Sequence, residues 1–223
     1  MRSVVAAAAL FMLAACASGP PPPDWQMNAR SAMERYLDAY FGGEVRIEAQ
    51  ELQRVRAEIA RTGRPELLAR AELLRCAAQV ASLDFDECPA YQALEPDAAA
   101  PERAYADYLS ARIAPANVAL LPEPQRALAA TAGAGPGDAA ALLKIEDPLS
   151  RLVAAGVLLR GARAHPAVFG VAIDTASAQG WRRPLMAWLK LALQRAEQAG
   201  DSADAQRLRR RIALVEGGGT APK

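Results

Sequence analysis

The chain contains 223 residues and has nearly balanced charges, with 26 Lys and Arg against 25 Asp and Glu. This balance excludes the strongly basic surface typical of nucleic-acid-binding proteins, so no nucleic-acid partner is expected. The single histidine excludes the usual multi-histidine metal centres, and no metal or other bound cofactor is expected.

The N-terminus has the composition of an export signal. Arg2 is the one charged residue before position 16, and residues 4–15 are all small or apolar. A charged start followed by about 7–15 apolar residues is typical of a secretory signal. Because a membrane-spanning helix needs about 20 apolar residues, we expect residues 1–15 to be a signal peptide that is removed.

The motif Leu13-Ala14-Ala15-Cys16 closes this segment and resembles the lipobox of bacterial lipoproteins. The resemblance implies a diacylglycerol on the Cys16 thiol, cleavage before Cys16 and acylation of the new amino terminus, which together anchor a protein stably. Ala17 and Ser18 stand where an Asp favours inner-membrane retention, so the analogy implies the outer membrane, facing the periplasm. An ordinary signal peptide with an incidental Cys16 is the alternative.

Four prolines, Pro20 to Pro23, follow Cys16 closely. Successive prolines favour an extended helix of about 3.1 Å per residue. Residues 16–23 are therefore expected to be a lipidated, semi-rigid tether of roughly 20 Å. Residues 24–216 then form the α-helical domain, and residues 217–223 a disordered tail.

Helical spacing of apolar residues runs through this domain, and strand alternation is nearly absent. Abundant alanine and sparse β-branched residues favour an all-α fold. The predicted helices cover residues 24–41, 44–62, 65–82, 101–113, 138–145, 148–164, 166–179, 182–199 and 202–215, with short helical turns at 116–121 and 124–132. On the third helix, the side chains expected to face inward are Leu67, Leu68, Ala71, Leu74 and Ala78. Residues 133–137 are the best candidate hinge.

The segment from Ala187 to Ala205 resembles a tetratricopeptide unit, because Gly200-Asp201 marks a turn and Ala205 lies where a second helix packs closely. The resemblance implies antiparallel helical hairpins packed as a tetratricopeptide-like or α-solenoid array. The first two helices share the pattern loosely, and no clean repeat of about 34 residues runs through the chain.

Two cysteines remain besides Cys16: Cys76 on the third predicted helix and Cys88 in a loop over residues 84–96. In the oxidising compartment that the lipobox implies, we expect a disulfide between them. Two buried free thiols are the alternative.

The sequence lacks Gly-x-Ser-x-Gly, Ser-x-x-Lys and phosphate-loop motifs, so no catalytic residue is assigned and the chain is not expected to be an enzyme. Asp84, Asp86 and Glu87 lack the glycine and distal glutamate of a calcium loop, which favours a solvated loop. His165 precedes Pro166 and is expected to cap or pack at a helix junction.

Four arginines lie on the last predicted helix, namely Arg207, Arg209, Arg210 and Arg211. They are candidates for contact with anionic lipid headgroups or with an acidic partner. The polar outer face of a terminal capping helix explains them equally well.

We therefore expect an outer-membrane-anchored periplasmic lipoprotein that acts as a non-catalytic adaptor or scaffold for periplasmic protein partners. One alternative is a cell-wall hydrolase or lyase, which needs two carboxylates about 5–9.5 Å apart in a concave pocket. Another is a small-ligand-binding lipoprotein, which needs a closed apolar cavity between helices. The sequence leaves the oligomeric state open.

Overall fold

A computed structural model describes residues 21–131, 135 and 137–217. Within these ranges the fold is all-α, with no strand, and its helices pack against one another. The all-α prediction is confirmed. The expected signal peptide and lipidation site Cys16, most of the hinge at 133–137 and most of the tail at 217–223 lie outside the described residues.

The observed helices follow the predicted ones closely, because glycine and proline mark most of their ends. They are α1 Asp24–Gly42, α2 Val45–Ala60, α3 Pro65–Ala81, α4 Pro89–Gln92, η1 Glu95–Asp97, α5 Ala100–Leu109, η2 Pro115–Leu120, α6 Glu123–Ala129, α7 Gly137–Leu143, α8 Pro148–Arg160, α9 Pro166–Ala178, α10 Arg182–Gln198 and α11 Ser202–Glu216. The predicted loop at 84–96 contains the single turn α4 and the start of η1.

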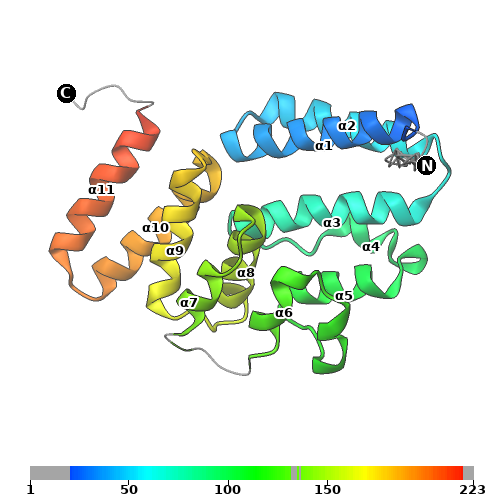
Figure 1. Cartoon of the computed structure of the whole chain (residues 1–223). Helices are drawn as coiled ribbons and strands as arrows, with labels where there is room; N and C mark the ends of the chain where they lie inside the picture. Colours follow the sequence, from blue (N-terminus) through cyan, green and yellow to red (C-terminus); the bar gives the residue numbers. More distant parts are fainter. Residues whose placement is uncertain (1–20, 132–134, 136, 218–223) are drawn as a thin grey trace, which may run out of the picture.

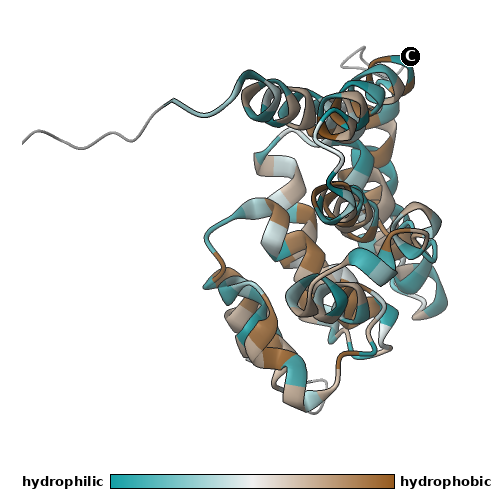
Figure 2. Cartoon of the chain, turned by 90° about the vertical axis from the view of Figure 1, so that its right-hand side faces the viewer, coloured by the Kyte–Doolittle hydropathy of each residue, from teal (hydrophilic) through white to brown (hydrophobic). Residues whose placement is uncertain are grey.

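The helices form an elongated, curved stack. Figure 1 shows α1 and α2 side by side, α3 running beneath them, and α9 to α11 at the end opposite the first turn of α1. Apolar residues lie mainly on the helix faces that turn toward neighbouring helices (Figure 2). Consecutive helices pack as pairs, most extensively α1 with α2 and α10 with α11. In the part of the chain that the structure describes, no helix is both long and apolar enough to span a bilayer.

Helix α3 is the centre of the packing. It contacts α8, α5 and both members of the α1–α2 pair. The closest approach is at Gly156 of α8, where an added Cβ would lie 2.3 Å from the carbonyl oxygen of Val80. At the C-terminal end of α3, the fully buried indole of Trp188 donates a hydrogen bond of 3.1 Å to the carbonyl oxygen of Ala81. Helix α10 is thereby joined to α3.

Buried carboxylates connect α1, α2 and α3. Glu72 of α3 is 2% exposed and accepts hydrogen bonds from Arg56 at 2.6 Å and Arg75 at 2.9 Å. Glu51 of α2 accepts one of 3.0 Å from Arg35 of α1. Removing the partner of a buried charge is strongly destabilising, so these pairs hold the three helices in one arrangement.

The α3–α8 contact gives a direct stability test. Gly156→Ala places a methyl group against backbone, which cannot move aside as a side chain can, and should lower the free energy of unfolding by about 1–3 kcal/mol. Chemical denaturation monitored by circular dichroism measures this change.

Gly170 of α9 is the matched control, because it is exposed and nothing lies within 4 Å of an added Cβ. Gly170→Ala should raise the stability by about 0.5–1 kcal/mol, since alanine is the better helix former. Equal effects of the two substitutions would show that α3 and α8 do not cross closely at Gly156.

Candidate functional site

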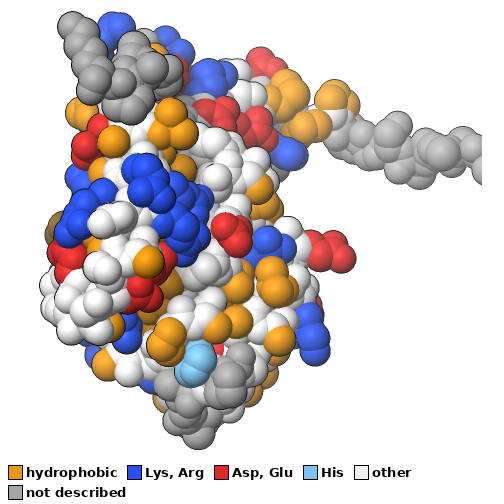
Figure 3. Space-filling view, turned by 90° about the vertical axis from the view of Figure 1, so that its left-hand side faces the viewer, with side chains coloured by type: hydrophobic (Ala, Val, Ile, Leu, Met, Phe, Trp, Pro, Cys, Tyr) orange, Lys and Arg blue, Asp and Glu red, His pale blue; other side chains and the backbone are white. Residues whose placement is uncertain are grey.

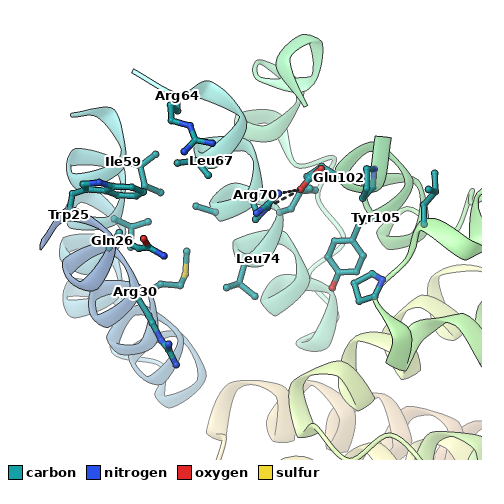
Figure 4. Close-up of a pocket in the computed structure, with 18 residues that line it drawn as sticks. Trp25, Gln26, Arg30, Ile59, Arg64, Leu67, Arg70, Leu74, Glu102 and Tyr105 are labelled. Carbon is teal, nitrogen blue, oxygen red and sulfur yellow. Dashed lines mark hydrogen bonds and ion pairs between the residues drawn. The ribbon is translucent and has the colours of Figure 1, made fainter. Parts of the chain in front are cut away.

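A groove opens between the α1–α2 pair, α3 and α5, with a volume of about 770 Å³ (Figure 4). It is lined by Trp25, Gln26, Ala29, Arg30, Met33, Val55, Ile59, Arg64, Leu67, Arg70, Ala71, Leu73, Leu74, Pro101, Glu102, Tyr105, Leu120 and Pro122. The lining is mostly apolar, and the groove is open to solvent rather than enclosed.

One wall of the groove comes from α1 and α2. Trp25, Ala29 and Met33 recur every four residues of α1, which brings them to one face of the helix. Val55 and Ile59 repeat the same spacing on α2. Trp25 and Ile59 lie close together on this side of the groove in Figure 4.

The floor comes from the face of α3 that the sequence pattern assigns to the core. Leu67, Ala71 and Leu74 pack against the core but are only partly buried and line the groove, whereas Ala78 of the same predicted stripe is fully buried. The face of α3 that carries Ala69 and Val80 is buried more completely. Helix α3 is apolar on both faces because α8 covers one of them, and periodicity alone does not say which face is covered.

The opposite wall comes from α5 and η2. Tyr105 faces the groove, and burial raises the pKa of its phenol, which therefore stays neutral at physiological pH. Glu102 accepts hydrogen bonds of 2.8 and 2.6 Å from Arg70, across the line where α3 meets α5. Leu120 and Pro122 extend this wall beyond α5.

Three guanidinium groups belong to the groove lining, against one carboxylate, that of Glu102. Arg30 of α1 donates to Glu34 at 3.0 Å, and Arg64 donates to Glu66 at 2.7 Å. The hydrogen bond from Arg64 lowers the pKa of the Glu66 carboxyl. The groove is therefore an apolar trough whose margin carries three arginines, each paired with a carboxylate of the chain.

The predicted cysteine pair is bonded. A disulfide joins Cys76 of α3 to Cys88, whose Cα atoms are 5.9 Å apart. Cys88 lies directly before α4 with a positive φ of 55°. The bond therefore fixes the loop at 84–96 to α3, on a different side from the groove lining.

The four arginines of α11 are not brought to the groove. Figure 3 shows basic side chains gathered on the face at this end of the molecule, with acidic ones among them. Arg207 donates to Asp204 at 2.9 Å, and Arg209 pairs with Glu197 of α10. Arg210 is exposed and Arg211 is partly exposed.

The acidic loop and the histidine have structural partners. Asp86 accepts a hydrogen bond of 2.8 Å from the backbone N–H of Cys88, and Glu87 pairs with Arg160 at 2.8 Å. Across the described ranges, no group of three or more potential ligands is arranged to hold a metal ion. His165 caps α9, because its Nδ1 accepts from the N–H of Ala167 at 3.2 Å, and this capping prediction is confirmed.

Two other hollows contain carboxylates. One, beside the disulfide, has a volume of about 80 Å³ and is lined by Asp86, Glu87, Glu95 and Asp107 among others. The other lies between α6 and α7 and is lined by Glu123, Glu146 and Asp147. Asp147 serves as the cap of α8, accepting from the N–H of Ser150 at 2.7 Å.

No family model, curated protein or solved structure matches this chain.

The disulfide can be tested in the native protein. Alkylation followed by mass measurement should modify neither Cys76 nor Cys88 until a reductant is added, because the thiols are joined. The double variant Cys76→Ala/Cys88→Ala should lose about 3 kcal/mol of stability, since the unfolded chain is no longer constrained. Two thiols alkylated without reductant in folded protein would contradict the bond.

Proposed function

We propose that the chain is a lipoprotein anchored through Cys16, on the periplasmic face of the outer membrane, and that its helical domain is a non-catalytic adaptor for protein partners. The observation that carries the adaptor role is the groove between α1, α3 and α5. The lipid on Cys16 is the one covalent group that the proposal requires.

The form of the groove favours a protein segment over a small ligand. Small-molecule sites enclose most of their ligand's surface in a cavity, whereas this groove is open to solvent and bounded by several helices. The lining is mostly apolar, which favours an apolar segment of a partner as the occupant.

We further propose that the helical hairpins form a tetratricopeptide-like or α-solenoid array. The pairing of α10 with α11 across the turn at Gly200 and Asp201 supports this, as does Ala205, which is 2% exposed. The arginines Arg207 to Arg211 are then the outer face of the terminal helix, and their pairs with Asp204 and Glu197 support that role.

The position of the groove agrees with a tethered adaptor. Helix α1 begins at Asp24, directly after the proposed tether of residues 16–23, and Trp25 lines the groove one residue later. A partner bound in the groove would thus be held close to the lipid anchor.

Site-specific crosslinking tests the adaptor role. A photo-crosslinking benzoylphenylalanine in place of Leu74 should yield discrete protein adducts in the native host, because Leu74 lies on the floor of the groove. The same group in place of Leu143, which is 61% exposed and does not line the groove, should yield none of them. An absence of adducts from Leu74 would contradict the adaptor function.

The anchor is tested by Cys16→Ser. This variant should move from the membrane fraction to the soluble fraction and lose incorporation of labelled fatty acid, since the thiol that carries the lipid is gone. Its helical circular dichroism should be unchanged, and Ser18→Ala should remain with the membrane. A Cys16→Ser chain that stays lipid-labelled would disprove the proposed attachment site.

A further inference from the structure

The walls of the groove limit the kind of protein segment that fits it. Every lining residue lies on a helix or a short connection between helices, and the described ranges contain no strand whose edge a peptide could extend. Helices pack onto the side chains of other helices with their axes about 8–10 Å apart. A helix laid over the floor formed by α3 is therefore the natural occupant.

The apolar residues of the groove require an apolar face on that helix. Leu67, Ala71 and Leu74 form a continuous stripe along α3, and Met33 and Ile59 approach from the other wall. Leu67, Ala71 and Leu74 are only partly buried, whereas Met33 and Ile59 are 9% and 6% exposed. A segment with apolar residues at positions i, i+3, i+4 and i+7 presents a matching stripe.

The charged residues at the margin of the groove indicate which residues should border the apolar face of the bound helix. Arg30 lies on the α1 side of the groove, and Arg64 and Arg70 lie on the α3 side (Figure 4). Their side chains are 82%, 55% and 67% exposed. Each guanidinium has five N–H donors, and the pairs with Glu34, Glu66 and Glu102 use one or two of them.

The pairs Arg30–Glu34 and Arg64–Glu66 are exposed, unlike that of Arg70 with the buried Glu102, and exposed ion pairs contribute little stability and exchange readily. The arginines can therefore bind further carboxylates when a partner arrives. Because Arg30 and Arg64 lie on opposite sides of the trough, carboxylates are expected on both edges of the bound helix.

From these features we infer that the groove binds an amphipathic α-helix of a partner protein, with an apolar face toward α3 and Asp or Glu residues along its edges. The inference rests on the proposed adaptor function and names the class of partner.

Two matched synthetic peptides test it. Both have about 15 residues, or roughly 22 Å as a helix, and the same leucine stripe, but one carries Glu and the other Lys on both edges. Fluorescence anisotropy with the purified whole chain in nonionic detergent should give at least tenfold tighter binding of the Glu peptide. The preference should shrink as salt is added, since exposed charges are screened.

Variants locate the binding. Arg30→Gln/Arg64→Gln should abolish the preference for the Glu peptide and leave weaker binding of both peptides. Leu74→Glu should abolish binding of both, with the helical circular dichroism unchanged. Arg61→Gln is the control, because Arg61 is 65% exposed and paired with Glu58 but does not line the groove.

Several outcomes would overturn the inference. Equal binding of the two peptides, or tighter binding of the Lys peptide, would contradict the inference that the partner helix carries acidic residues. If the chain bound oleate but neither peptide, the occupant of the groove would be a lipid. If the chain formed a dimer that Leu74→Glu dissociates, the occupant would be a second copy of the chain. Failure of both peptides, with specific protein adducts still formed from Leu74, would reject the helical partner while the adaptor function stands. Loss of the adducts as well would reject both.

Discussion

The close crossing of α3 and α8 is the constraint on which the rest of the structure depends. Gly156 lets the two backbones approach at Val80, and the indole of Trp188 adds α10 to the same end of α3. One face of α3 is thereby buried completely. The other face is left to the α1–α2 pair and α5, which cover it only in part, and the groove is the uncovered remainder.

Polar groups keep this arrangement from collapsing into alternative packings. Glu72 and Glu51 are buried carboxylates whose partners Arg56 and Arg35 come from a neighbouring helix, so sliding these helices past one another would leave a buried charge without its partner. Tyr108 and Gln125, hydrogen-bonded at 2.6 Å, connect α5 to α6 in the same way. The groove is therefore bounded by helices whose relative positions are held by buried interactions, which suits a preformed binding site.

Two regions of positive charge have different surroundings. At the groove, Arg30, Arg64 and Arg70 are exposed, pair with acids of the chain and border an apolar trough. On α11, Arg207 and Arg209 pair with nearby acids on a convex helical surface. The four arginines are conspicuous in the sequence, yet the arginines that line the groove, and that our proposal uses, are Arg30, Arg64 and Arg70.

Much of the local structure followed from the sequence. Helical periodicity and the glycines and prolines at helix ends predicted nearly every helix, because these signals act within a few residues. The Cys76–Cys88 bond was also predictable, since only two cysteines remained for an oxidising compartment. The lipobox at Cys16 is a purely local motif, and the proposed address of the protein depends on it.

Only the tertiary structure decided which face of α3 is buried most completely and which lines the groove. Leu67, Ala71 and Leu74 have the same periodicity as a buried stripe, and nothing in the sequence says that α8 covers the other side of the helix. The groove brings together side chains from Trp25 to Pro122, and such distant residues meet only when whole helices pack. Periodicity reports that a face is apolar, but what lies against that face is set by contacts far away in the chain.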